Sequence, residues 1–250
     1  MAGFKAALVN ELYKLLKKKK MIATAVLSLL VVLIGQLAVT AVTHGLGLRL
    51  AGSAEFPFVV LTLLSYTLLP LFAAFVAIDA FCGEFSSNTM KLTLTRPVSR
   101  FGVYSAKVGT VAVFIVANLL FVMILALLAG FLFNPQSAEA SGIVKVVLAY
   151  VVTGLPLFVF ALVVVVLANL LRSGTAVFFL SVLLYLVFHF LGIVFSRYAS
   201  FFVTSSFDWY TLWIADAVNW GKILRQLLIL LGCGMMLFTA GYYLFERKDL

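Results

Sequence analysis

Six long runs without a charged residue set the strongest constraint on what this chain can fold into. The runs lie between Lys20 and Arg49, Glu55 and Asp79, Lys107 and Glu139, Lys145 and Arg172, Arg172 and Arg197, and Arg225 and Glu246. Each is long enough to cross a bilayer, because about 20 apolar residues span the hydrocarbon core as a helix. The runs are continuously apolar and do not alternate at a period of two, so they indicate helices and not a membrane β-barrel.

We therefore predict an all-α polytopic membrane protein with six transmembrane helices. The expected spans are about residues 21–43, 56–78, 108–133, 146–171, 174–196 and 226–245. Pro70 and Pro156 fall inside the second and fourth spans, where kinks are tolerated if neighbours satisfy the carbonyl groups that each proline leaves free. No internal repeat or low-complexity linker is evident, so residues 1–250 are expected to form one transmembrane domain.

Composition and charge placement exclude a soluble fold. The chain is 64% hydrophobic and 11% charged, whereas soluble domains carry roughly 25% charged residues. The net charge of +9 would suit a nucleic-acid partner, but with cytoplasmic termini thirteen Lys and Arg residues fall inside and five outside. This positive-inside bias explains the charge. We expect a multi-pass protein of the cell (plasma) membrane with both termini in the cytoplasm, in contact with lipids and without a nucleic-acid partner.

Residues 1–20 have the period of an amphipathic helix. Its apolar face comprises Phe4, Leu8, Leu12, Leu15 and Leu16, and its opposite face Glu11, Lys14, Lys17 and Lys18. Such a helix suits the inner membrane interface, with its lysines toward anionic headgroups. It serves either as a plain anchor for the first span or as an elbow helix that also contacts a cytoplasmic partner, and the pattern leaves both open.

The segment between the second and third spans concentrates charge beside spans that hold none. A short helix is predicted to begin near Glu84, whose carboxylate suits the positive end of a helix dipole, and to end before Pro97. Its apolar side would comprise Phe85, Met90, Leu92 and Leu94, and its cationic side Lys91, Arg96 and Arg100. A helix of this kind suits either force transmission from a soluble partner or a solvated connection.

The string GEFSSNTMKLTLTRPVSR, from Gly83 to Arg100, resembles the loop of ABC-2-type ABC transporter permeases. That family typically shows a Glu followed by a stretch similar to G-T-x-K-x-L-L-T-x-P-V-S-R, and Asn88 stands here where a Gly is common. The N-terminal string NELYKLxKKK, from Asn10, also looks like the opening of the family. Six spans cover the whole length.

The resemblance implies the permease subunit of a bacterial ATP-driven exporter that forms its translocation path as a dimer. Residues 84–96 would be the coupling helix that docks on a separate ATPase, and the N-terminal helix would be the elbow. The implied coupling residues are Glu84, Phe85, Lys91, Arg96 and Arg100, and those of the elbow are Phe4, Leu8, Leu12 and Lys14. A second permease copy and two ATPase subunits would complete the transporter, with ATP and Mg on the ATPase and no cofactor on this chain.

No catalytic, cofactor-binding or metal-ligating residue is predicted, so the chain is not expected to be an enzyme by itself. Its one Gly-Lys pair, Gly221-Lys222, has Asp216 where a Walker A motif requires its first glycine. None of the acidic residues lies in a span core. Gln36 and Asn118 are polar residues inside spans, and they suit either helix–helix hydrogen bonding or a translocation path. The alternative function is a polytopic scaffold or membrane-embedded enzyme that is not coupled to an ATPase.

The segment between the fifth and sixth spans holds all three Trp residues. Such aromatic density indicates a segment that lies at, or re-enters, the outer interface. Asp208 is predicted to cap a short helix that starts at Trp209. The resemblance implies short outer helices that close an external gate with Asp208, Trp209 and Trp213, while an aromatic belt without a gating role is the alternative. No motif indicates the cargo.

Overall fold

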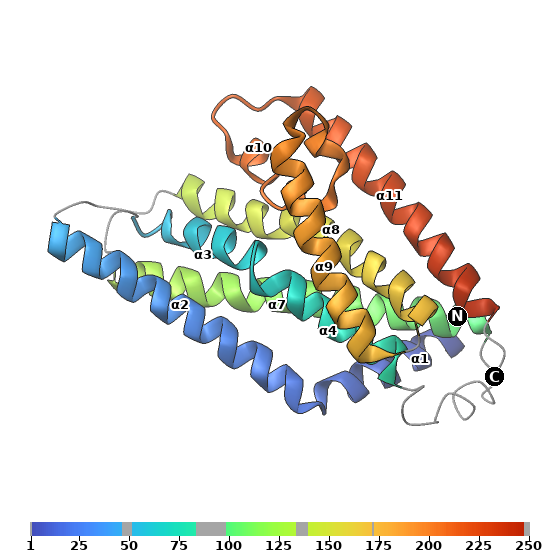
Figure 1. Ribbon diagram of the computed structural model, residues 1–250. Coiled ribbons are helices and arrows are strands. Elements are labelled where there is room, and N and C mark those ends of the chain that lie inside the picture. The colour runs from blue at the N-terminus through green and yellow to red at the C-terminus, as the bar shows by residue number, and fades with distance from the viewer. Residues whose placement is uncertain (1, 47–51, 84–98, 134–139, 172, 248–250) are drawn as a thin grey trace.

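The computed structural model describes residues 2–46, 52–83, 99–133, 140–171 and 173–247, and every regular element within these ranges is helical (Figure 1). The long and medium helices are α1 (Ala2–Leu16), α2 (Lys19–Leu46), α3 (Phe56–Ser65), α4 (Leu68–Phe81), α7 (Arg100–Phe133), α8 (Ala140–Leu171), α9 (Gly174–Val194) and α11 (Trp220–Glu246). Three short elements connect α9 to α11, namely η1 (Ser196–Phe201), η2 (Val203–Ser206) and α10 (Thr211–Ile214).

Five helices are long and apolar enough to cross a membrane, and a bent pair makes a sixth candidate. The five are α2, α7, α8, α9 and α11, and the pair is α3 with α4. The prediction of an all-α polytopic membrane protein is therefore confirmed. Several helices extend beyond the predicted spans, most of all α7, which begins at Arg100 and not near residue 108. The hydropathy boundary at Lys107 does not end this helix, because the ammonium group is satisfied inside the protein.

The second predicted span, over 56–78, is broken into two helices near Pro70, where the sequence allowed a kink. α3 and α4 meet at an angle of 49°, and Thr67, between them, has non-helical backbone angles of φ −124° and ψ −84°. Pro70 lies in the first turn of α4, where its missing N–H is tolerated. The same missing donor removes the hydrogen bond that would tie Pro70 to the Tyr66 carbonyl, so a break just before α4 is favoured.

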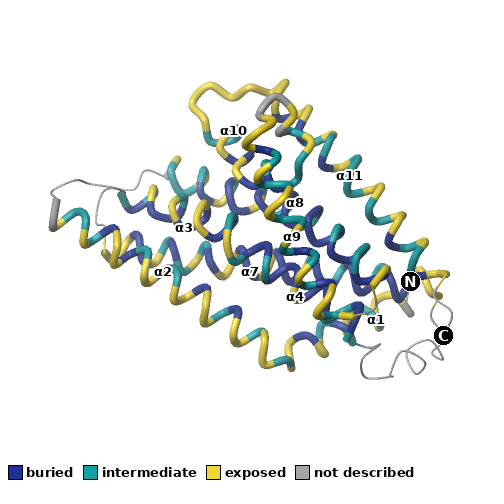
Figure 2. Tube along the Cα trace, viewed as in Figure 1, coloured by how far each residue is buried: buried dark blue, intermediate teal, exposed yellow. Residues whose placement is uncertain are grey.

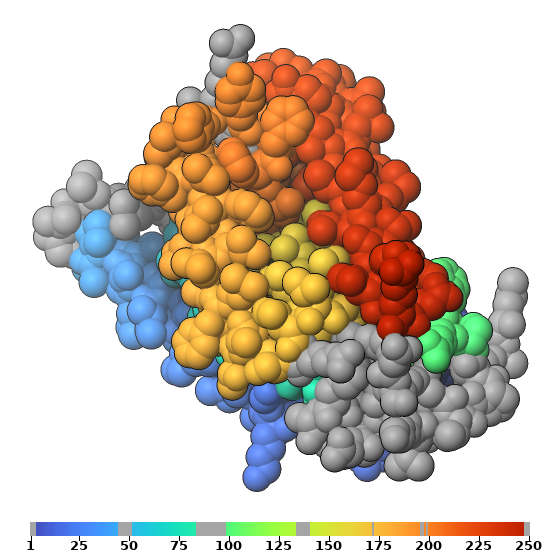
Figure 3. Space-filling view, turned by 45° about the vertical axis from the view of Figure 1, so that its right-hand side comes forward, coloured from blue at the N-terminus to red at the C-terminus, as the bar shows by residue number. Residues whose placement is uncertain are grey.

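The core lies along α4, α7 and α8, as the dark blue segments of Figure 2 show. Its largest fully buried side chains include Tyr104, Tyr150, Phe81 and Leu157. Large apolar side chains also remain on the outside, for example Met236, which is 73% exposed. Exposure on this scale is expected where lipid, and not water, covers the surface. Figure 3 shows one such face, with α8 visible between α9 and α11.

The two ends of the bundle differ in what they contain. One end, called here the termini end, carries α1, the end of α4, the start of α7 and the end of α11, with both chain termini (Figure 1). The other, called the far end, carries the short elements η1, η2 and α10, the end of α9 and the start of α11. The ion pairs and hydrogen bonds described below lie mainly at the termini end and around the segment that connects α9 to α11.

Candidate functional site

The whole predicted coupling helix, residues 84–96, lies outside the described residues. Glu84, Phe85, Lys91 and Arg96 belong to this group, so their predicted roles stay predictions. Arg100 is described, and it is the first residue of α7. Its Nη1 donates to the carbonyl oxygen of Glu246, in the last turn of α11, at 2.6 Å. Arg100 therefore joins the start of α7 to the end of α11, directly beside the segment predicted to meet a partner.

A buried ion pair joins α1 to α7 at the termini end. The Nζ of Lys107 lies 3.3 Å from Oε2 of Glu11 and donates to the carbonyl oxygen of Ala80, in α4, at 2.7 Å. The two charged side chains are only 1% and 9% exposed. Burying charge costs free energy unless the charge is paired and hydrogen-bonded. One ammonium group thus holds three helices together, and α1, α4 and α7 cannot separate here without exposing unpaired charge.

This arrangement corrects the sequence interpretation of α1. Glu11 was expected on the polar face, opposite the apolar one, but it is buried and paired with Lys107 of α7. Leu15 is buried as well. Leu8 packs on the same side, next to Gly109, which leaves room for its Cδ1. Phe4 is exposed and Leu12 half-buried, so only part of the predicted apolar face contacts protein. The helical period alone could not reveal that a carboxylate would be paired inside the bundle.

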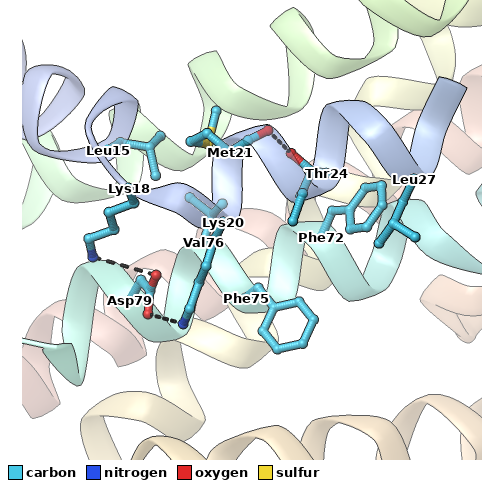
Figure 4. Close-up of a pocket in the computed structure, with 11 residues that line it drawn as sticks. Leu15, Lys18, Lys20, Met21, Thr24, Leu27, Phe72, Phe75, Val76 and Asp79 are labelled. Carbon is cyan, nitrogen blue, oxygen red and sulfur yellow. Dashed lines mark hydrogen bonds and ion pairs between the residues drawn. The ribbon is translucent and has the colours of Figure 1, made fainter.

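The other charges of this region form a second, more exposed group. Lys14 donates to the remaining oxygen of Glu11, Oε1, at 2.7 Å. Asp79, near the end of α4, pairs with two lysines at the α1–α2 junction: its Oδ2 lies 3.5 Å from Lys18 and its Oδ1 2.8 Å from Lys20 (Figure 4). These pairs attach the start of α2 to α4, and Lys14 completes the pairing of the buried carboxylate.

The segment between α9 and α11 contacts four helices. Phe207 is fully buried and packs near Tyr66, Phe160 and Tyr185, from the α3–α4 break, α8 and α9. The fourth helix is α11, whose buried Gln226 donates through Nε2 to the hydroxyl of Ser206. A segment that reaches the break in the second span enters the bundle and does not lie flat on it. Whether the segment lies at the outer interface or re-enters it stays a prediction.

Pro70 and Pro156 explain two further hydrogen bonds in this part of the bundle. Pro70 leaves the carbonyl of Tyr66 without its helical donor, and the Tyr185 hydroxyl donates to that oxygen at 2.7 Å. Pro156 does the same to Val152, whose carbonyl accepts from Trp209 Nε1 at 3.1 Å. Each carbonyl left free within a span is thus satisfied by an aromatic donor from another part of the chain, as the membrane requires.

Replacing Tyr185 by Phe is expected to lower the free energy of unfolding by about 1 kcal/mol, because the Tyr66 carbonyl loses its donor inside the bundle. The ring, which stacks on His189, is kept. Unfolding by sodium dodecyl sulfate in mixed micelles measures the change, and Tyr198→Phe, at an exposed tyrosine, is the control. An equal effect of the two substitutions would contradict the role assigned to the Tyr185 hydroxyl.

The predicted gate residues are partly rearranged. Trp209 is buried, and its ring meets that of Trp213 edge-on at 5.7 Å. Asp208 does not cap a helix at Trp209, because α10 begins only at Thr211 and has no side-chain cap. The Asp208 carboxylate lies near the hydroxyl of Tyr66.

Tyr210, which sequence reasoning did not single out, fixes this segment to α3. Its hydroxyl lies 2.7 Å from that of Thr62, and its ring stacks on Phe58. Burial raises the pKa of Tyr210, the hydrogen bond to Thr62 lowers it, and the charge of Asp208 raises it further. Gln226 was also missed, since it directly follows Arg225 at the predicted edge of the last span.

The predicted pathway residues are both buried. Gln36 donates through Nε2 to the hydroxyl of Thr40, one turn further along α2, at 3.2 Å. Asn118 lies inside α7, and within the described part of the chain its Oδ1 is buried without a hydrogen-bond partner. The helices that carry them, α2 and α7, pack against each other. Their assignment to a translocation path stays a prediction.

Comparison with known proteins gives one informative result. A family model described as "ABC-2 family transporter protein" matches residues 7–192. The match begins within α1 and ends within α9, so it includes the buried ion pair and the predicted coupling segment. A comparison with curated proteins gives no significant match.

Proposed function

Because the chain belongs to the ABC-2 family of transporter proteins, we propose that it is the permease subunit of an ATP-driven exporter. Family membership makes it a transport component of the membrane and implies an ABC ATPase as partner. Beyond this, the proposal is that two copies of the chain form the translocation path and bind two ATPase subunits. ATP and Mg bind to the ATPase chains, and this chain supplies no catalytic group.

The observation that carries the proposal is the set of contacts on either side of the predicted coupling segment. Residues 84–96 follow α4 and precede α7 in the chain. The ends of these two helices are held together by the Lys107 ammonium, which binds the Ala80 carbonyl from its place in α7. The same ammonium pairs with Glu11 of α1. A force applied by an ATPase to this segment therefore acts on three helices that move together.

The two ends of the bundle then have different tasks. The termini end faces the cytoplasm, which the excess of Lys and Arg on that side supports. The far end carries the external gate, formed by Asp208, Trp209 and Trp213 in the segment that contacts α3, α8, α9 and α11. Gln36 and Asn118 contribute polar groups to the path between the ends. Anchoring of the gate segment on four helices supports this assignment, because a movement of any of them is passed to the gate.

Co-purification tests the proposal. The affinity-tagged full-length chain is extracted from its native membrane, and we expect a Walker-motif ATPase in equal molar amount. Charge reversal of Glu84→Lys with Arg96→Glu should reduce ATPase recovery by roughly tenfold or more, since unpaired charges at an interface cost several kcal/mol.

The matched control is the exchange Lys145→Glu with Asp216→Lys. These residues form an exposed ion pair of 3.1 Å at the far end, so their reversal changes the same number of charges without touching the coupling segment. Absence of any ATPase from the wild-type preparation would refute the permease assignment and favour a scaffold or membrane-embedded enzyme. Equal recovery with both double variants would refute the coupling assignment alone.

A further inference from the structure

Two neighbouring cavities at the termini end share one charged pair. The walls of the first are apolar, and the second combines apolar side chains such as Phe178 with Ser173 and Thr175. The first, of about 210 Å³, lies between the start of α2 and α4 (Figure 4). Its apolar lining includes Leu15, Met21, Leu27, Phe72, Phe75 and Val76. The second, of about 630 Å³, lies between α4 and the start of α9. Both are lined by Lys20, Phe75 and Asp79, so the Lys20–Asp79 pair stands between them.

The charge around the Lys20–Asp79 pair is positive and is accessible to an anion. Two ammonium groups, from Lys18 and Lys20, approach the single carboxylate of Asp79. The lysine side chains are 38% and 62% exposed, whereas that of Asp79 is 17% exposed. An anion that arrives from outside therefore meets the lysines first. Their charge exceeds that of the carboxylate by one unit.

The position of the site relative to the membrane limits what can occupy it. Lys20 is the last charged residue before the apolar run of α2, so its ammonium group lies at the level of the lipid headgroups. The cavities extend from it along α2, α4 and α9, which are the surfaces that acyl chains cover. A ligand with one anionic group and two apolar chains matches this arrangement.

We propose that an anionic phospholipid binds here, with its phosphate held by Lys18 and Lys20 and one acyl chain in each cavity. The phosphate takes over part of the pairing that Asp79 now provides, and the chains fill space between helices that the protein leaves open. The proposal concerns a bound lipid of the leaflet at the termini end. It does not depend on transport or on an ATPase.

The test uses the full chain reconstituted in phosphatidylcholine vesicles that contain a trace of spin-labelled phosphatidylglycerol or spin-labelled phosphatidylcholine. The immobilised fraction of each label gives the relative association of the two lipids. We expect a preference of about fivefold or more for phosphatidylglycerol, since each lysine near a membrane surface contributes about a fivefold attraction for an anionic lipid. Lys18→Gln with Lys20→Gln should bring the preference close to one.

The matched control removes the same charge from α1 and from the residue that follows it, outside the cavities. Lys5 and Lys17 are exposed and line neither cavity, so Lys5→Gln with Lys17→Gln should keep most of the preference. Asp79→Asn should raise the preference, because both lysines lose their competing carboxylate. A destabilised protein does not produce a gain, and this variant therefore separates a lipid site from a purely structural ion pair.

Four results would overturn the proposal. The first is an unchanged preference in the Lys18/Lys20 variant, and the second is an equal loss in the control, which would show general surface attraction. The third is a lower preference after Asp79→Asn. The fourth is an unchanged immobilised fraction of phosphatidylglycerol in the variant Ala23→Trp. Ala23→Trp narrows the first cavity without changing charge, and we expect it to reduce immobilisation of phosphatidylglycerol.

Discussion

Replacing Lys107 by Met is expected to lower the free energy of unfolding by about 3–5 kcal/mol. Breaking a buried ion pair by removing one partner leaves the other charge uncompensated, and the cost is of this size. In this protein Glu11 would keep Lys14 but lose its buried partner, and the Ala80 carbonyl would lose a donor at 2.7 Å. Unfolding by sodium dodecyl sulfate in mixed micelles measures the difference.

The double variant Glu11→Met with Lys107→Met should recover most of this loss, because it removes both buried charges together. Lys145→Met is the matched control. Lys145 also forms an ion pair, with Asp216 at 3.1 Å, but that pair is exposed to solvent, and exposed pairs contribute little to stability. If Lys107→Met and Lys145→Met had similar effects, or if the double variant were worse than Lys107→Met, the buried pair would not hold α1 to the bundle.

The second large effect is expected at Trp209. Trp209→Ala should cost about 3–5 kcal/mol, since a buried Trp side chain loses its packing. Trp209→Phe keeps a ring in place and removes only the Nε1 donor, so about 1–3 kcal/mol is expected for the unsatisfied Val152 carbonyl. The segment between α9 and α11 loses this hydrogen bond to α8 in both variants. If the segment forms the proposed gate, we expect ATP-independent leakage of a fluorescent probe from vesicles to rise with the destabilisation.

A second substitution, at Pro156, isolates the contribution of the Trp209 hydrogen bond. In Pro156→Ala, the backbone N–H of residue 156 can donate to the Val152 carbonyl, as in a regular helix. Trp209→Phe should therefore cost less in that background than in the wild type, and the difference in a double-mutant cycle reports the hydrogen bond alone. Trp220→Phe, at a tryptophan that is 68% exposed, should change stability little. Strict additivity of Trp209→Phe and Pro156→Ala would show that the indole donor does not replace the missing helix bond.

The two predictions concern opposite ends of the molecule but rest on the same physical condition. Inside a membrane, neither a charge nor a carbonyl group finds water as an alternative partner. The protein must therefore supply a partner from another helix, and that partner then fixes how the helices lie against each other. Lys107 does this for α1, α4 and α7, Trp209 does it for the segment between α9 and α11, and Tyr185 does it for α9 and the α3–α4 break.

The sequence predicted the helical membrane fold because the requirement for long apolar runs is local. Each span is identified by about 20 consecutive residues, and no contact between distant segments enters that argument. The break in the second span was predicted only in part. Pro70 indicated that one carbonyl would lack its helical donor. Nothing in the sequence placed the break at residues 66–67 or identified Tyr185 as the new donor. The coupling segment was recognised by resemblance, and the family match supports the family without describing its structure.

The candidate site was less predictable than the fold, because its residues are far apart in the chain. Glu11 and Lys107 are separated by 96 positions, and the helical period of α1 placed Glu11 on the solvent side. Gln226 and Tyr210 looked like ordinary boundary residues. Gln226 contacts Ser206, and Tyr210 contacts Thr62, only when the segment between α9 and α11 is folded into the bundle.

By itself, then, the sequence determined that the charge-free runs become apolar helices, and it indicated which family they belong to. The tertiary structure alone decided which polar groups are paired inside the bundle. The physical reason is that hydrophobic transfer into a bilayer is nearly additive along the chain, whereas a buried charge or a proline-freed carbonyl is stable only if a particular partner comes within hydrogen-bonding distance. The placement of that partner depends on how all the helices pack.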